Sequence, residues 1–294
     1  TLSLHDALPI YEDYPKKFLQ LKNPPKAIWV KGDISLLEKP ALAIVGSRKN
    51  TPYGEKIAKL FATQIAKQGI VIVSGLALGI DTIAHTYSKS SLGNTIAEVG
   101  SGLNQIYPEE NRKLAKEIID GGGCLLSEYE PDEKVNMRNF PKRNRLICAL
   151  SEGIFVVEAD YRSGSKLTGN LGLKYGKKVF CVPRNIGELR GWGTNLLMQE
   201  GAKLVLSPGD ILEEYGIKYD KKEELEQIYE KKKKIKIKPE YKELYNLITE
   251  KPIEINELAK KSNLDISELN QKITMMEIEG YIESLPGNEY KRVE

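Results

Sequence analysis

Short apolar runs alternate with helical patterns over the first two thirds of the chain. Residues 41–45 are all apolar, and a pattern with helical spacing follows at 53–67. The same arrangement returns around three further apolar runs, at 70–73, 94–99 and 153–159. Strands that are apolar throughout are buried on both faces, which is typical of parallel strands joined by helices. The pattern therefore predicts an α/β fold with an extended Rossmann-like, doubly wound and mostly parallel sheet.

A different pattern occupies the end of the chain. Three helical patterns at 241–248, 255–262 and 266–279 precede two extended runs that Pro286-Gly287-Asn288 separates. Helices followed by a hairpin predict a small winged-helix domain. The third helix carries more acidic than basic side chains, which is unfavourable next to a polyanion. We therefore expect this domain to contact proteins or to regulate, rather than to read duplex DNA.

These patterns divide the chain into four segments. We predict a Rossmann-like DNA-binding domain at 14–217, a charged linker at 218–239 and the winged-helix domain at 240–294. Residues 1–13 resemble a truncated or foreign end, because they contain neither an initiating Met nor a basic segment followed by a hydrophobic one. The Lys-rich block 231–238 indicates a solvated tether that could add non-specific attraction to phosphates.

Composition narrows the class of protein. The longest nearly apolar stretch, 69–80, falls short of the roughly 18 residues that a membrane span needs, so no membrane is expected. Three cysteines lie far apart in apolar surroundings and indicate buried thiols in a reducing cytoplasm rather than a metal site. Residues 241–294 contain 7 basic and 11 acidic side chains, whereas residues 1–240 contain 37 and 30. The basic character thus belongs to the large domain and the linker.

Gly/Ser turns follow the predicted strands. Gly46-Ser47-Arg48 follows the first strand, and Arg162-Ser163-Gly164-Ser165 follows the last. Unpaired backbone N–H groups at the start of a helix favour anions, and parallel sheets bind ligands at the carboxyl ends of their strands. The turn at 100–105 lacks the third glycine of the dinucleotide fingerprint, and no Walker sequence occurs. A nicotinamide enzyme is therefore poorly supported.

The segment 138–145 contains four cations, one aromatic ring and no acidic residue. Its candidate strand-binding side chains are Arg138, Phe140, Lys142, Arg143 and Arg145. Cations neutralise phosphates and release counterions, while an aromatic ring offers a face on which an unpaired base can stack. The alternative is a surface loop whose Phe140 packs into the core. The neighbouring Gly/Ser turns favour the first interpretation.

Residues that could perform catalysis are few. His85 is the one plausible histidine, and we expect it to be a hydrogen-bonded helix residue rather than a general base. Asp81 could cap or orient a turn. Glu128 and Glu158 should lie at the same sheet edge, where nearby arginines are expected to pair with them. We expect no catalytic residue, no metal ion and no cofactor.

Several motifs together resemble the DNA-processing protein A family, also called DprA or Smf. They are Ala43-Ile44-Val45-Gly46-Ser47-Arg48, Ser74-Gly75-Leu76-Ala77-Leu78-Gly79-Ile80-Asp81, Ile106-Tyr107-Pro108, Ser127-Glu128-Tyr129, Phe140-Pro141-Lys142-Arg143-Asn144-Arg145 and Arg162-Ser163-Gly164-Ser165. The resemblance runs from about Tyr14 to the C-terminus. It implies a homodimer that binds single-stranded DNA, protects incoming strands in natural transformation and loads the recombinase RecA, without established catalytic activity.

Carried onto this chain, the resemblance agrees with the residues chosen by charge and stacking. The candidate DNA-binding residues are Gly46, Ser47, Arg48, Arg138, Phe140, Lys142, Arg143, Arg145, Arg162, Ser163, Gly164, Ser165 and Lys166. Lys166 and Arg184 replace an apolar residue and a glycine that are usual in the family, and both could strengthen phosphate contact. Glu98 interrupts a strand that is normally aliphatic, which questions the burial of that strand.

Two other functions remain open at this point. One is a related Rossmann enzyme that hydrolyses the N-glycosidic bond of nucleoside monophosphates, although its Pro-Gly-Gly-x-Gly-Thr-x-x-Glu signature is absent. The other is transcriptional regulation through the winged helix.

Overall fold

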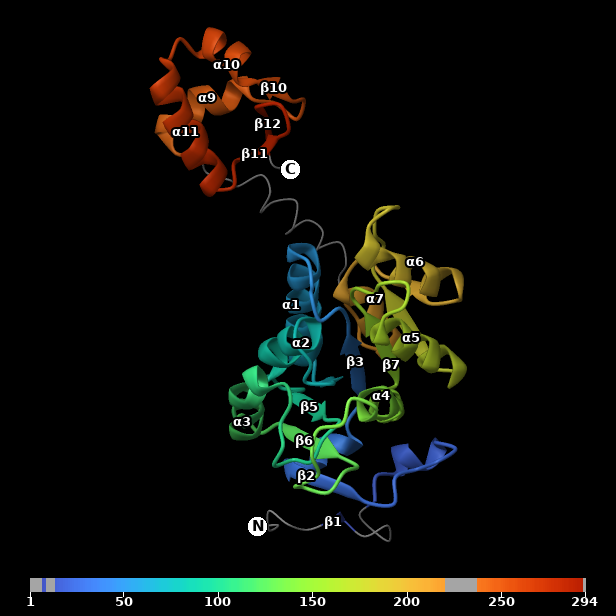
Figure 1. Ribbon diagram of the computed structural model, residues 1–294. Helices are drawn as coiled ribbons and strands as arrows, with labels where there is room; N and C mark the ends of the chain where they lie inside the picture. The colour runs from blue at the N-terminus through green and yellow to red at the C-terminus, as the bar shows by residue number, and fades with distance from the viewer. Residues whose placement is uncertain (1–6, 9–13, 220–236, 293–294) are drawn as a thin grey trace. The chain divides into compact units, whose positions relative to one another are not determined.

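The computed structural model describes residues 7–8, 14–219 and 237–292 (Figure 1). The chain forms two compact units, Thr1–Tyr219 and Asp220–Glu294. Most of the segment that we expect to be a foreign end and most of the expected linker lie outside the described residues.

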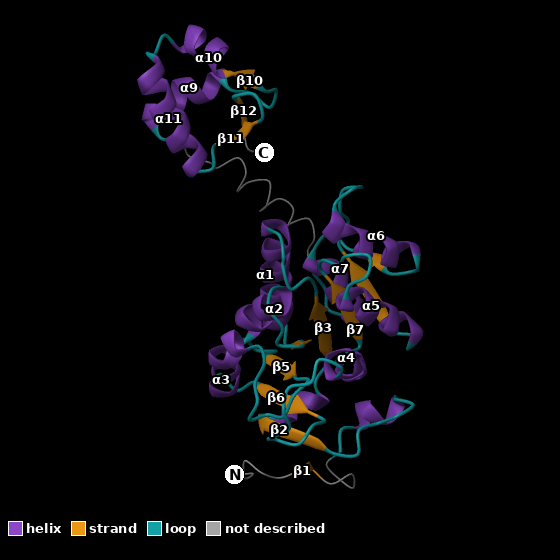
Figure 2. Cartoon of the chain, in the orientation of Figure 1, coloured by secondary structure: helices purple, strands orange, loops and turns teal. Residues whose placement is uncertain are grey.

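The first unit is built on one twisted sheet, coloured orange in Figure 2. Its described strands are ordered β1 (Ala7–Leu8), β2 (Ile28–Gly32), β6 (Cys124–Ser127), β5 (Thr95–Glu98), β4 (Val71–Ser74), β3 (Ala41–Val45), β7 (Gly153–Val156), β8 (Lys178–Cys181) and β9 (Lys203–Leu204). Strands β6 to β9 in this order are parallel, while β2 pairs antiparallel with β6 and β1 with β2. The mostly parallel, doubly wound sheet is confirmed.

Helices cover both faces of the sheet (Figure 1). One face carries α1 (Pro52–Lys67), α2 (Ile80–Ser88), α3 (Arg112–Asp120) and α7 (Pro208–Leu212), and the other carries α4 (Asn139–Leu150), α5 (Gly164–Lys174) and α6 (Trp192–Gln199). Alternate side chains of β3 lie on opposite faces of the sheet: Leu42 and Ile44 pack with α1, and Ala43 packs with α4. The continuous apolar run at 41–45 is therefore explained by burial on both sides.

The predicted strands and helices agree with the structure to within a few residues, but one segment does not. Residues 138–145 are not a loop, because α4 begins at Asn139. Pro141 is compatible with the first turn of a helix, where the backbone N–H has no intrahelical acceptor in any case. The charged Glu98 does not prevent burial of its strand, since all four residues of β5 are buried. The strands β2, β6, β8 and β9 were not among the predicted elements.

The second unit has the predicted winged-helix architecture. Its helices are α9 (Lys242–Leu247), α10 (Ile255–Ser262) and α11 (Ile266–Ile278), and its sheet has the order β10 (Ile253–Glu254), β12 (Glu289–Arg292), β11 (Ile282–Leu285). Leu244, Leu258 and Ile273 meet in a separate apolar core. Asp265 caps α11 by accepting a hydrogen bond from the Glu268 amide.

Among the helices in the described ranges, none combines the length and the apolar character that crossing a bilayer requires.

Candidate nucleic-acid groove

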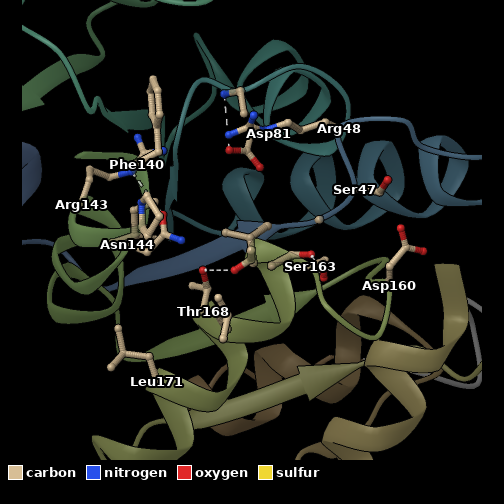
Figure 3. A pocket seen from close by; sticks show the side chains of 18 of the residues that line it. Ser47, Arg48, Asp81, Phe140, Arg143, Asn144, Asp160, Ser163, Thr168 and Leu171 are labelled. Carbon is tan, nitrogen blue, oxygen red and sulfur yellow. Dashed lines mark hydrogen bonds between the residues drawn. The ribbon is translucent and has the colours of Figure 1, made fainter. Parts of the chain in front are cut away.

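A groove of about 760 Å³ opens where β3 and β7 end (Figure 3). Strand order reverses there, because β4, β5 and β6 lie on one side of β3 while β7, β8 and β9 lie on the other. Parallel sheets bind ligands at this switch point, outside the carboxyl ends of the strands. The walls come from the turns after β3 and β4, the first half of α4, the turn into α5 and Arg190.

The turn after β3 is held by the neighbouring turn before α2. The Ile80 amide donates to the Ser47 carbonyl at 3.1 Å, and the Lys49 amide donates to Ser47 Oγ at 3.1 Å. Gly79 has a φ of +78°, and a Cβ there would lie 2.3 Å from the Ser47 carbonyl oxygen. This close approach is open to glycine alone. The turn thus presents the exposed side chains of Arg48 and Lys49 at the groove.

The turn into α5 is a second segment that lines the groove. Ser163 caps the helix by accepting from the Lys166 amide at 3.1 Å, and its hydroxyl lies 3.0 Å from that of Ser165. Gly164 is exposed, and a Cβ there would meet nothing within 4 Å. The start of α5 is therefore open to a ligand, and the helix dipole favours an anion at this place.

Phe140 is more deeply placed than its sequence context indicates. The residue is 8% exposed, its ring lies 5.5 Å from the Tyr107 ring, and the Arg48 guanidinium stands 5.8 Å above it. A Cβ on Gly100 would lie 2.7 Å from the ring, so the ring has little room to move. Phe140 still lines the groove, but as part of its floor. Its burial agrees with the alternative that Phe140 packs into the core, and stacking of a base on the ring stays a prediction.

Arg143 points inward from α4 and is 3% exposed. Its Nη1 donates to the Gly75 carbonyl at 2.9 Å and to the Glu98 carbonyl. Among the neighbouring charges, the carboxylate of Asp81 acts most strongly on Arg143. Burial lowers the pKa of Arg143 and raises the pKa of Asp81. The guanidinium of Arg143 therefore links the carboxyl ends of β4 and β5 through these hydrogen bonds. Arg143 also lines the groove, and its contact with a phosphate stays a prediction.

Two further predicted DNA ligands pair with carboxylates of the same chain. Arg145 pairs with Glu128, and Lys166 Nζ lies 3.0 Å from Glu200. Neither side chain lines the groove. Arg184 likewise pairs with Glu158 and is 6% exposed at the side chain, so little of its charge is accessible to a phosphate. These intrachain carboxylates compete with a phosphate for the three cations, whose contacts with DNA stay predictions.

The other candidates keep the predicted arrangement in part. Gly46, Ser47, Arg48, Ser163, Gly164 and Ser165 all line the groove. Arg138, Lys142 and Arg162 are exposed but do not line it. Sequence reasoning missed several lining residues: Lys49, Met137, Asn144, Asp160, Leu167, Thr168 and Arg190. The first six are next to or within predicted motifs, whereas nothing in the sequence around Arg190 connects it with this edge.

The remaining polar residues support structure rather than chemistry. His85 is fully buried, accepts from the Leu76 amide at 3.3 Å and lies 2.8 Å from Thr95 Oγ1; burial lowers its pKa to about 3. The expected hydrogen-bonded role of His85 is confirmed, as are the arginine partners of Glu128 and Glu158. All three cysteines are free and buried. In the described ranges, no His/Cys/Asp/Glu group could hold a metal ion.

Family profiles match both units of the chain. The profile of DNA recombination-mediator protein A matches residues 7–216, and the profile of the DprA winged-helix domain matches residues 235–288. Protein Smf of Escherichia coli is 35% identical over 278 residues, which is 94% of this chain and 74% of that protein. The DNA processing protein DprA of Bacillus subtilis is 40% identical over 204 residues, covering 69% of this chain and 68% of that one.

Solved structures agree with the sequence comparisons. DNA processing protein A of Streptococcus pneumoniae has a TM-score of 0.68 at 38% identity, covering 73% of this chain and 75% of that one. The same protein of Helicobacter pylori, whose single-stranded DNA binding mode has been described structurally, has a TM-score of 0.65 at 37% identity, covering 71% and 94%. Together with the Gly/Ser turns and the groove that they form, these matches show that the chain belongs to the DNA-processing protein A (DprA/Smf) family.

Proposed function

We propose that the chain binds single-stranded DNA in the groove at the ends of β3 and β7. The observation that carries this proposal is that one groove contains two features that favour phosphate. Arg48 and Lys49 extend from the turn after β3, and Gly164 leaves the start of α5 open. Within the described residues, neither cation has an ion-pair partner in the chain.

Apolar side chains in the same groove favour an unpaired strand over a duplex. Met137 and Leu167 line the groove and are each 60% exposed, and Phe140 lines it as part of the floor. Bases of a single strand can contact such surface, whereas in a duplex they are stacked inside the helix. Backbone attraction supplies affinity without sequence preference.

The peripheral cations extend the attraction. Arg138, Lys142 and Arg162 stand exposed next to the segments that line the groove. We propose that they draw the polyanion in over a distance, with Arg48 and Lys49 making the close contacts. Arg143, Arg145 and Lys166 bond to groups of the same chain, so we propose that they contribute less to the direct contacts than Arg48 and Lys49 do.

The cellular role proposed for this binding follows the family. The chain protects incoming single strands in natural transformation and loads RecA onto them, as a cytoplasmic homodimer that mediates recombination without catalysis. The relative from Helicobacter pylori with a described single-stranded DNA binding mode supports the first step of this role. Loading is tested by the rate at which RecA nucleates on a strand covered with single-strand binding protein, with and without the chain.

Filter binding over a salt series tests the proposed function. The full chain is titrated against a dT oligonucleotide and against a duplex of the same length. We expect the single strand to bind more tightly and its affinity to fall steeply with salt, with a slope of about 0.7 per neutralised phosphate. Arg48→Ala should lower the slope by about 0.7.

Lys142→Ala is the matched variant, because it removes one exposed cation from the outward side of α4. It should change affinity less than Arg48→Ala. Absence of binding by the wild-type chain at low salt would overturn the proposed function. Release of free base from a panel of nucleoside monophosphates would instead revive the N-glycosidic hydrolase hypothesis.

A further inference from the structure

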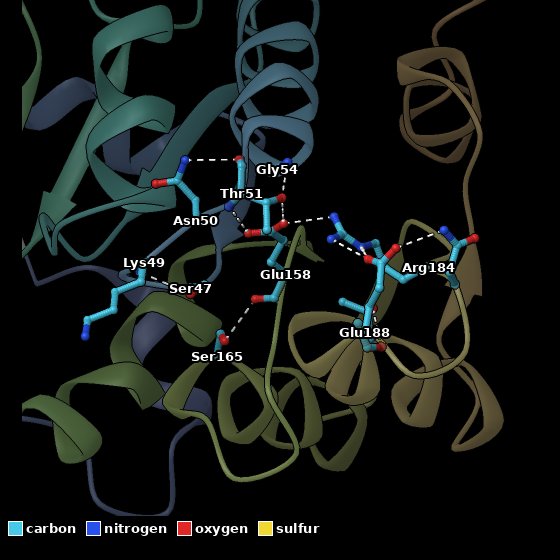
Figure 4. A network of polar contacts seen from close by, with 12 residues as sticks. Ser47, Lys49, Asn50, Thr51, Gly54, Glu158, Ser165, Arg184 and Glu188 are labelled. Carbon is cyan, nitrogen blue, oxygen red and sulfur yellow. Dashed lines mark hydrogen bonds and ion pairs between the residues drawn. The ribbon is translucent and has the colours of Figure 1, made fainter. Parts of the chain in front are cut away.

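A buried carboxylate lies at the junction of the segments that form the groove. Glu158, just after β7, is 0% exposed. It accepts hydrogen bonds from the Thr51 amide at 3.0 Å, from the Thr51 hydroxyl, and from Arg184 Nη1 at 2.8 Å (Figure 4). A Cβ on Gly54 would lie 2.3 Å from the Glu158 carboxyl carbon, so α1 packs directly on this group.

The hydrogen-bond partners of Glu158 belong to, or adjoin, different segments that line the groove. Thr51 caps α1 immediately after the turn that carries Arg48 and Lys49. Arg184 begins the segment that ends with Arg190, whose carbonyl accepts from the Ala159 amide at 3.0 Å. The Glu158 carbonyl accepts from Ser165 Oγ at 3.2 Å, in the first turn of α5. One residue thus connects three groove-lining segments.

Arg184 supplies the positive charge that balances the buried carboxylate of Glu158. It also donates to Glu188, at 2.8 Å from Nε and 2.7 Å from Nη2, and its guanidinium lies 4.5 Å from the centre of the Tyr53 ring. Its own amide donates to Asn195 at 3.2 Å. Because two carboxylates share its guanidinium and its side chain is 6% exposed, this arginine is poorly accessible to a phosphate.

We propose that Glu158 and Arg184 are positioning residues of the DNA groove: they hold the Arg48–Lys49 turn and the Arg190 segment at a fixed separation without touching the strand. This inference rests on the proposed function. A groove held in its binding geometry loses less side-chain and loop freedom when the ligand arrives. The pair therefore raises affinity without adding to the number of phosphates neutralised.

The double variant Arg184→Met/Glu158→Gln tests the proposal, because it keeps the net charge and leaves no lone buried ion. We expect dT-oligonucleotide binding by the full chain to weaken about tenfold, from the freedom regained by the Arg48 and Arg190 segments. The slope of affinity against salt should stay unchanged. The midpoint of urea unfolding should also stay near the wild-type value.

Two single variants complete the design. Arg184→Lys keeps the charge but cannot hold two carboxylates with a planar fork, so we expect a smaller loss of affinity at an unchanged salt slope. Lys178→Met is the matched control, because Lys178 pairs with Glu214 at the opposite end of β8. It should bind the oligonucleotide as the wild type does.

The outcomes separate this inference from the proposed function. If the wild-type chain does not bind the oligonucleotide, the proposed function fails. If it binds and both Arg184 variants match it, only the positioning role is overturned. A lower salt slope would also overturn it, because it would mean that Arg184 contacts a phosphate. If the double variant does not fold, Arg184→Lys decides: wild-type affinity overturns the role, and weaker binding at the wild-type urea midpoint supports it.

Discussion

The two walls of the groove use similar residues in opposite ways. On the wall formed by the turns after β3 and β7, Arg48 and Lys49 are exposed and have no ion-pair partner within the described residues, and a Cβ on Gly164 at the start of α5 would meet nothing within 4 Å. On the α4 wall, helical spacing turns Phe140, Arg143 and Ile147 inward. A cation in a turn after a strand can reach solvent, whereas a cation on the buried side of a helix must find partners within the protein. Composition alone does not distinguish these cases.

The largest expected effect concerns Arg143. Arg143→Met should lower the free energy of unfolding by about 3–5 kcal/mol, because it leaves Asp81 buried without its cation. Arg48→Met, on the other wall, should change it by no more than about 0.5 kcal/mol. Urea unfolding followed by circular dichroism measures both. Equal stability of the two variants would contradict the contrast between the walls.

The pH dependence of stability tests the charges beneath α4. Burial raises the pKa of Glu98 from 4.5 to about 8, and neither of its carboxyl oxygens has a hydrogen-bond partner among the described residues. Because the folded-state pKa is raised, its stabilising contribution is complete below pH 4.5 and is lost as pH rises through about 8.

Glu98→Gln should remove this dependence. The wild type is expected to lose stability relative to the variant as pH rises, with a limiting slope of about 1.4 kcal/mol per pH unit. Urea midpoints across a pH series give the measurement, and Glu109→Gln, at an exposed carboxylate, is the control. Parallel curves for wild type and Glu98→Gln would show that Glu98 is not titrating in this range.

The smallest expected effect concerns Gly164, on the wall formed by the turns after β3 and β7. Gly164→Ala adds a methyl group that meets nothing within 4 Å, so stability should not fall. The methyl group would stand where a phosphate approaches the start of α5, and oligonucleotide affinity should fall several-fold. Filter binding and urea unfolding are compared on the same preparation. Unchanged affinity would mean that the strand does not approach α5.

Much of the site could be found from local sequence. A strand that ends in Gly46-Ser47-Arg48 and a strand followed by Ser163-Gly164-Ser165 are local signals, because a turn at the start of a helix exposes amides whatever surrounds it. Both turns line the groove. No helix was predicted for the basic segment, because its charges obscured the inward spacing of Phe140, Arg143 and Ile147. That spacing was visible in the sequence, although the partners of Arg143 were not.

The sequence by itself determined the parallel sheet, the winged-helix unit and the position of the Gly/Ser turns, because each depends on periodicity and on glycine placement within a few residues. Only the tertiary structure decided which cations are available. Arg143 meets Gly75 and Glu98, Arg184 meets Glu158, and Lys166 meets Glu200, across 26 to 68 positions in the chain. Whether a charge faces solvent or a buried partner depends on such distant contacts, and no local pattern records them.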